Sequence, residues 1–306
     1  MARVAFMGTP AFAVPILGVL LGEHQVVAVY TRPDQPAGRG QGLTPSPVKR
    51  LALERGLPVF QPATLKGEEA ALRGLAPEVI VVAAYGLLLP PAVLAVTPRG
   101  CVNVHPSLLP RHRGPSPVAG AILAGGGTTG VSLMLMDQGY DTGPLLAQEA
   151  LPILPHDTTL SLTERLAQAG ARMLQQLLPQ FLLGEVVPRP QEGPATYTRL
   201  IKKEEGEMGW RLSARELGLR VRAFSPWPGT YTRFRGKRLE VLESYPVEAP
   251  GPWTPGRVRL LAAGAGVETG DGVLELQVVQ LEGKKALPIS DFLRGQRDFS
   301  GSVLPY

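Results

Sequence analysis

Cysteine is almost absent from this sequence. Cys101 is the one cysteine in 306 residues, so the chain cannot form an internal disulfide. The sequence also lacks a cluster of cysteine and histidine with metal-ligand spacing, and we expect no metal centre. Cys101 precedes Asn103 by two residues and shares its strand face, so a role as a nucleophile stays open. The alternative is a small buried core residue, which is the usual state of a free cysteine.

Long apolar runs are missing as well. No uncharged hydrophobic stretch approaches the ~18 residues of a membrane-spanning helix. The N-terminus begins with an apolar strand, VAFM (4–7), and lacks the basic and cleavable regions of a signal peptide. With 44% hydrophobic and 19% charged residues the composition is that of a globular protein, and we expect a cytoplasmic monomer without membrane contact.

The glycine pattern of dinucleotide-binding proteins is also missing. It requires three spaced glycines after the first strand and an acid near the end of the second. Here the first strand runs into GTPAF (8–12), with a single glycine, and the second ends in YTR (30–32). The run GGGTTG (125–130) has the spacing but follows a predicted helix and precedes a strand, so we predict a turn there.

The N-terminal part does contain alternating strands and helices. Short strands rich in valine and isoleucine are predicted at 3–7, 26–30, 59–60, 79–83, 101–105 and 131–136. Helices are predicted at 11–21, 47–55, 68–75, 116–124 and 158–183. This alternation predicts an α/β fold with a doubly wound, mainly parallel sheet.

The C-terminal part has a different pattern. A chain of this length usually divides into two domains, and the proline-rich segment 187–194 suits a semi-rigid linker. We therefore predict a catalytic domain at 1–186, a linker at 187–206 and a C-terminal domain at 207–306. In the last, a helix at 214–223 precedes short strands that favour a small β-barrel, at 230–234, 238–245, 257–262, 267–268, 273–280 and 285–288.

Basic residues are concentrated near the start of this C-terminal domain. The formal net charge is +5, and eight arginines and lysines between Arg211 and Arg238 stand against a single acid, Glu216. Such a stripe can bind the phosphates of a nucleic acid. It can equally be the solvated face of a helix and a hairpin.

The residues best suited to chemistry lie in and after the strand 101–105. Its period-two alternation puts Asn103 and His105 on one face where the strand ends, and the carboxyl ends of strands are where open α/β sheets bind ligands. An acid, Asp141, follows in the motif DQGYDTG (137–143). Each has a structural alternative, since Asn103 could cap a turn, Asp141 could start one, and His105 could be a core histidine.

Two motifs, NVHPSLLPRHRG (103–114) and DQGYDTG (137–143), resemble the signature of the folate-dependent formyltransferases. Further segments resemble the branch of that family that formylates methionine-charged initiator tRNA. They are MGTPAFAVP (7–15), the loop 33–49, RAFSPWPG (222–229), GKK (283–285) and DFLRG (291–295). The resemblance implies a formyltransferase fold followed by an OB-like tRNA-binding domain, with 10-formyltetrahydrofolate as co-substrate, methionyl initiator tRNA as acceptor and no metal.

In this family formyl transfer passes through a tetrahedral carbon that bears an oxyanion. The resemblance implies that Asn103 donates a hydrogen bond to that oxygen. His105 would stabilise it as an imidazolium or pass protons. Asp141 would hold His105 charged and oriented, or organise a water that carries the proton between the two nitrogens. His112 has no companion motif, and we expect it at the surface or in a secondary role.

The resemblance also implies a folate pocket. Its predicted lining is the turn after the strand with residues from two other loops: Ser107, Leu108, Leu109, Pro110, Leu87 and Asp137. A rigid, proline-bounded turn suits a flat heterocycle that is recognised through backbone hydrogen bonds. A plain loop exit is the alternative for Leu108 and Leu109.

For the tRNA, the resemblance implies contacts from Arg39, Lys203, Arg222, Lys284 and Lys285. Arg39 lies among glycines in a loop, 31–46, that is too long and polar for a simple connection, and the family inserts this loop into the acceptor stem. A generic flexible loop is the alternative for Arg39, and a solvated linker charge for Lys203. Members of this family commonly have an acidic residue followed by a tryptophan just after the linker. This chain has Gly209 before Trp210 instead, and Glu207 is the candidate to replace the missing acid.

Other functions compete with this interpretation. A formyltransferase for a small amine, such as glycinamide ribonucleotide or an amino sugar, is disfavoured by the long C-terminal domain and the arginine-bearing loop. A nucleic-acid-binding protein without catalysis would leave Asn103, His105 and Asp141 unexplained. A folate hydrolase or a dehydrogenase would need a further domain or a cofactor site that the sequence lacks.

Overall fold

The computed structural model describes residues 1–37, 42–262 and 264–305. Within them the chain forms two compact units, each with its own sheet. Unit 1 comprises Met1–Pro117, Thr128–Pro152 and Thr163–Thr198, and unit 2 comprises Val118–Gly127, Ile153–Leu162 and the chain from Arg199 onward. The domain limits at 186 and 206 remain predictions.

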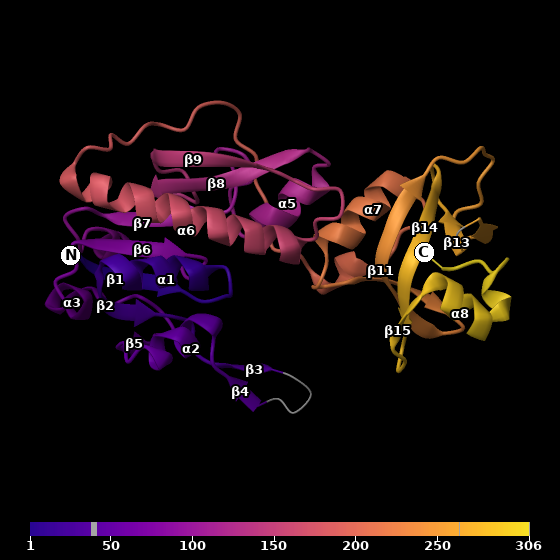
Figure 1. Cartoon of the computed structure of the whole chain (residues 1–306), viewed down its shortest axis with the longest axis horizontal. Coiled ribbons are helices and arrows are strands. Elements are labelled where there is room, and N and C mark those ends of the chain that lie inside the picture. The colour runs from indigo at the N-terminus through magenta and orange to yellow at the C-terminus, as the bar shows by residue number, and fades with distance from the viewer. Residues whose placement is uncertain (38–41, 263, 306) are drawn as a thin grey trace. The chain divides into compact units, whose positions relative to one another are not determined.

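Unit 1 is built on a sheet of seven strands in the described part of the chain (Figure 1). Their order is β5 (Val59–Phe60), β2 (Gln25–Tyr30), β1 (Arg3–Gly8), β6 (Val79–Ala83), β7 (Cys101–His105), β8 (Thr128–Leu135) and β9 (Leu145–Pro152). The strands from β5 to β7 run parallel, whereas β8 and β9 are antiparallel to their neighbours. The predicted mainly parallel, doubly wound sheet is confirmed.

Helices connect these strands along the chain. They are α1 (Ala13–Glu23), α2 (Pro47–Glu54), α3 (Glu69–Gly74), α4 (Pro91–Leu94), α5 (Pro117–Leu123) and α6 (Thr159–Leu183). Of these, α5 from Val118 onward and the first turn of α6 belong to unit 2. The start of α2 is set locally, because the Ser46 side chain accepts a hydrogen bond from the Lys49 amide. A Cβ on Gly170 of α6 would lie 2.7 Å from Val104 Cγ1, so this glycine lets α6 approach β7 closely.

Unit 1 also differs from the prediction. Strand β9 occupies a stretch where the sequence predicts no element, at the edge of the sheet beside β8. Part of the predicted loop 31–46 is an antiparallel hairpin of β3 (Gln35–Ala37) and β4 (Gly42–Thr44). Arg39, predicted in this loop, lies outside the described residues.

The sheet of unit 2 is antiparallel, as expected for an OB-like domain. Its order is β10 (Thr230–Phe234), β11 (Lys237–Val247), β14 (Val273–Leu281), β13 (Gly264–Glu268) and β12 (Val258–Leu261), and β15 (Ala286–Pro288) also pairs with β14. Besides most of α5, the helical elements of this unit include η1 (Lys203–Gly206), α7 (Ala214–Ala223), α8 (Ile289–Gly295) and η2 (Arg297–Phe299). In the described ranges, no helix has the length and apolar character needed to cross a membrane.

Candidate functional site

Strand β7 carries the first two candidate catalytic residues. Asn103 is 8% exposed and His105 is 5% exposed. Asn103 is paired with Val82 of β6 on one side and with Met134 of β8 on the other. Because alternate residues of a strand point to the same face, the amide and the imidazole share one face of the sheet, as the sequence predicts.

Both ring nitrogens of His105 have a neighbour. Nε2 lies 3.2 Å from the carbonyl oxygen of His112, and Nδ1 lies 3.6 Å from Oδ1 of Asp141. A carbonyl oxygen only accepts hydrogen bonds, so we assign the proton of the neutral ring to Nε2 and a lone pair to Nδ1. Burial lowers the pKa of His105, while the Asp141 carboxylate and the His112 carbonyl oppose this effect. The ring is therefore neutral at neutral pH.

Asp141 reaches His105 from the loop that follows β8. Its second oxygen, Oδ2, accepts a hydrogen bond of 2.7 Å from the Gly114 amide. Gly114 has a φ of +103°, and a Cβ there would lie 2.5 Å from the carbonyl oxygen of Thr198, so this position requires glycine. The structure thus brings His105 and Asp141 together, with Asn103 two residues earlier on the same strand.

The turn predicted to line the folate pocket is fixed by polar groups of β8 and β9. The Ser132 hydroxyl accepts from the Leu109 amide at 3.0 Å and donates to the Ser107 carbonyl oxygen at 2.6 Å. Nε2 of Gln148 donates to that hydroxyl at 2.9 Å and to the Leu109 carbonyl oxygen at 2.8 Å. Neither Ser132 nor Gln148 is among the predicted site residues. Ser132 could have been found as a polar residue within the predicted strand 131–136, whereas Gln148 lies where no element was predicted.

Side chains of this turn differ in exposure. Ser107, Leu109 and Pro110 are buried, and the peptide bond before Pro110 is cis. Leu108 is half-buried and lies over Gly130 of β8, where a Cβ would come within 2.6 Å of its Cδ2. The close approach of Leu108 to β8 therefore depends on glycine at position 130.

The other two candidate pocket residues have different roles in the fold. Leu87, beyond β6, packs against the apolar cluster that contains Cys101. Asp137 is exposed, and its Oδ1 accepts hydrogen bonds from the Gly139 amide at 3.0 Å and the Thr142 hydroxyl at 2.7 Å. Asp137 therefore shapes the loop that delivers Asp141.

Cys101 is part of the core rather than of the chemistry. It is 1% exposed, and burial raises the pKa of its thiol to about 12. A thiol with that pKa carries almost no thiolate at neutral pH and is a poor nucleophile. Across the described ranges, no three side chains of histidine, cysteine, aspartate or glutamate gather as a metal site.

Comparison with known proteins identifies the family. Residues 2–178 match the formyl transferase family, and residues 200–297 match the formyl transferase C-terminal domain. A methionyl-tRNA formyltransferase of Dehalococcoides mccartyi is 47% identical over 306 residues, covering 98% of this chain and 97% of that protein. The chain belongs to the methionyl-tRNA formyltransferase family. Another member, from Thermus thermophilus, is 48% identical over 297 residues, with 96% of each chain covered.

The fold extends beyond the close relatives in this family. An N-formyltransferase from Helicobacter canadensis, crystallised with folinic acid and dTDP-3-aminofucose, matches with a TM-score of 0.69 at 17% identity. The match covers 93% of this chain and 100% of that one. At this identity the likeness concerns the fold alone.

The basic residues that the family resemblance suggested for tRNA binding have different environments. Lys203 in η1 and both Lys284 and Lys285, between β14 and β15, are exposed. Arg222 in α7 is half-buried, its Nη1 donates to the Asp157 carbonyl oxygen at 3.1 Å, and burial lowers its pKa. The lysines are therefore more accessible to a polyanion than Arg222 is.

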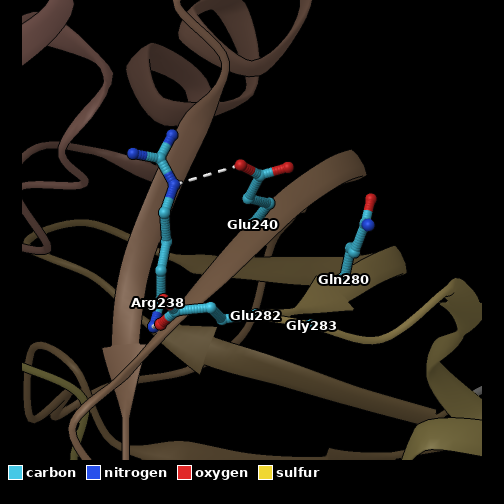
Figure 2. A pocket seen from close by; sticks show the side chains of 5 residues that line it. All are labelled: Arg238, Glu240, Gln280, Glu282 and Gly283. Atoms are coloured by element: carbon cyan, nitrogen blue, oxygen red, sulfur yellow. Dashed lines mark hydrogen bonds and ion pairs between the residues drawn. The ribbon is translucent and has the colours of Figure 1, made fainter. Parts of the chain in front are cut away.

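A pocket of about 220 Å³ adjoins this lysine pair on the sheet of unit 2 (Figure 2). Its lining is Arg238, Glu240, Gln280, Glu282 and Gly283. The Arg238 side chain pairs with Glu240 at 3.0 Å and lies over the Tyr231 ring, 3.7 Å from its centroid. This arginine of the basic stripe is thus partly neutralised by its own neighbours.

His112 corrects one expectation. It is 9% exposed rather than on the surface, with a φ of +58°. Its role is secondary and comes from the backbone, since its carbonyl oxygen holds His105 and its amide donates to the Thr196 hydroxyl at 2.8 Å. At the position where this chain has Gly209 instead of the family's acid, the following Trp210 is fully buried in the core of unit 2, and Glu207, the candidate substitute, is exposed.

Proposed function

We propose that this enzyme transfers the formyl group of 10-formyltetrahydrofolate to the α-amine of methionine on charged initiator tRNA. The products are formylmethionyl-tRNA and tetrahydrofolate. The observation that carries the proposal is the pair of buried His105 and half-buried Asp141 at 3.6 Å, with Asn103 on the same strand as His105. The named relatives supply the acceptor, and folate is the formyl donor of the family.

Asn103 is assigned to the oxyanion. When the amine attacks the formyl carbon, the formyl oxygen gains negative charge in the tetrahedral intermediate. A side-chain amide can donate a hydrogen bond to that oxygen without changing its own protonation. Since Asn103 is buried, the bond forms in a medium of low dielectric constant, where it is stronger than in water.

His105 and Asp141 are assigned to proton transfer. The attacking amine must lose a proton, and the folate nitrogen must gain one as its bond to the formyl carbon breaks. The Nδ1 lone pair of neutral His105 can accept the first proton, directly or through a water. The resulting imidazolium would face the Asp141 carboxylate, whose charge stabilises it until the proton passes to the leaving nitrogen.

The substrates would occupy different parts of the chain. We propose that the folate lies against Ser107, Leu108, Leu109, Pro110, Leu87 and Asp137, where the hydrogen-bonded turn 107–111 offers fixed backbone groups. Candidate tRNA contacts are Arg39, Lys203, Lys284 and Lys285, with Arg222 a weaker one because it is already bonded within the protein. The proposal includes a cytoplasmic enzyme that acts as a monomer.

The test is transfer of labelled formyl from 10-formyltetrahydrofolate to methionine-charged initiator tRNA, with charged elongator tRNA and free methionine as controls. Product with the initiator alone would support both the reaction and the acceptor. Product with free methionine or another small amine, and none with tRNA, would show that the acceptor is a small amine and not tRNA. No product with any of them would contradict the proposed reaction.

A further inference from the structure

A segment after α6 runs along the two loops that carry the site. We call residues 189–198 the strap; all of them belong to unit 1. At one end, Leu145 and Arg189 exchange backbone hydrogen bonds of 2.7 and 2.8 Å. At the other end, the Arg113 amide donates to the Thr196 carbonyl oxygen at 2.9 Å, and the Thr198 amide donates to the Arg113 carbonyl oxygen at 2.7 Å. The strap therefore joins the loop after β7 to the first residue of β9, where the loop after β8 ends.

Gln191 connects these loops with its side chain. Its Nε2 donates to two carbonyl oxygens, those of Asp141 and Gly143, each at 2.8 Å. Its Oε1 accepts from Arg113, at 3.2 Å from Nε and 2.7 Å from Nη2. Both amide protons and the carbonyl oxygen of this side chain are thus engaged.

The contacts of Gln191 complete a closed ring of interactions around the Asp141 carboxylate. The Gln191 side chain donates a hydrogen bond to the Asp141 carbonyl oxygen, and the Asp141 carboxylate accepts one from the Gly114 amide. Gly114 directly follows Arg113, whose side chain donates to Gln191 and so closes the ring. Asp141 has a φ of +54°, a conformation that non-glycine residues rarely adopt and that persists when the surroundings fix it. Free rotation of this backbone would turn the carboxylate away from His105.

We propose that Gln191 is a positioning residue that aims the Asp141 carboxylate at His105. It acts through the backbone of Asp141 and does not touch the substrates. This inference deepens the proposed function, because it concerns the same pair of residues. The competing explanation is that Gln191 only fixes the strap to the loop after β7 through Arg113, and so contributes to stability but not to catalysis.

Two substitutions separate these explanations. Gln191→Met removes all the hydrogen bonds of the side chain while keeping an unbranched chain without charge. Gln191→Glu keeps an acceptor for Arg113 but places oxygen where the two carbonyls need a donor. If Gln191 positions Asp141, both variants lose roughly tenfold to a hundredfold in kcat, with the KM for tRNA nearly unchanged. Glu192→Gln, on the exposed neighbouring residue, is the matched control and should retain the wild-type kcat.

A second readout requires no substrate. The charged and titratable groups that face His105 are the Asp141 carboxylate and the His112 imidazole. Since Asp141 raises the pKa of His105, a carboxylate that turns away should move the NMR titration of the His105 ring in Gln191→Met to lower pH. This result can be obtained even if the proposed acceptor is wrong, so failure of the two proposals can be told apart.

Two results would overturn the positioning role. One is a wild-type kcat in Gln191→Glu, which would mean that the Arg113 contact is what matters. The other is an unchanged His105 titration in Gln191→Met together with a lower thermal unfolding midpoint, which would mean that Gln191 contributes to stability alone.

Discussion

Among single residues, Asn103 is tested most directly. It is the only asparagine in the sequence. We expect Asn103→Ala to lower kcat by about a hundredfold to a thousandfold, with little change in either KM, because the oxyanion loses its donor. Steady-state formyl transfer measures the effect. Gln176→Ala, which removes an exposed amide from α6, is the control, and a loss in Asn103→Ala no larger than in that control would contradict the role.

The protonation state of His105 gives a second prediction. Burial lowers the pKa of this ring below 6.5, so its neutral form should persist into mildly acidic solution. We expect kcat to decline only when the pH falls through that lowered value, as the ring loses its lone pair. His105→Gln should lose roughly a hundredfold or more in kcat and also the decline at acid pH.

The matched control for His105→Gln is His156→Gln, on an exposed histidine of unit 2. Its kcat and its pH profile should follow those of the unchanged enzyme. If the acid limb persisted in His105→Gln, another group would be responsible for it.

At the scale of elements, the contact between β8 and the turn 107–111 can be tested at Gly130. A Cβ there would lie 2.1 Å from the Glu149 carbonyl oxygen of β9 and 2.6 Å from Leu108 Cδ2. We expect Gly130→Ala to lower the free energy of unfolding by about 1–3 kcal/mol, since a packed strand must shift. It should also raise the KM for the folate by displacing Leu108.

Urea denaturation measures the change in stability, and Gly126→Ala is the matched control. A Cβ on Gly126 meets nothing within 4 Å, so that variant should remain within about 0.5 kcal/mol of the unchanged protein. Equal stability of the two variants would show that β8 accommodates the methyl group.

The elements that the sequence predicted best have strong local signals. The limits of β6 and β7 were predicted to the residue, because strands buried on both faces form short apolar runs. Helix α7 was also predicted to the residue, and its start has a capping box of Ser213 and Glu216. Strand β9 has no such signal: its sequence, LLAQEALP, contains no β-branched or aromatic residue, and the strand depends on pairing with β8, which a local pattern does not contain.

The site divides in the same way. The motifs predicted that His105 and Asp141 act together, and the structure places them 3.6 Å apart. Sequence could not predict the partners that fix them, because the His112 carbonyl and the Gly114 amide are backbone groups, which no side-chain pattern marks. Gln191 is 50 residues from Asp141 and lies between prolines, so only the folded chain relates the two.

For the molecule as a whole, three buried or half-buried histidines predict a loss of stability in acid. Burial lowers the pKa of His24, His105 and His112 from 6.5, so the unfolded chain binds protons at a higher pH than the folded chain does. Their contribution to stability is therefore complete above pH 6.5 and decreases as the pH falls toward the lowered values.

We expect the free energy of unfolding of the protein to fall as the pH drops from 6.5 toward the lowered values. Denaturant titrations across this range measure it, and His24→Gln should flatten the dependence without touching the site. A free energy of unfolding that is constant from neutral pH to this range would contradict the prediction.

The strap also determines when the site can become complete during synthesis. The ribosome delivers the chain from its N-terminus at roughly 5–20 residues per second, and domains begin to fold as they emerge. Strand β7, with Asn103 and His105, is therefore available on the order of 10 s before Gln191 leaves the ribosome. A nascent chain that ended at residue 186, the predicted domain limit, would carry all three candidate catalytic residues but not the side chain that aims Asp141.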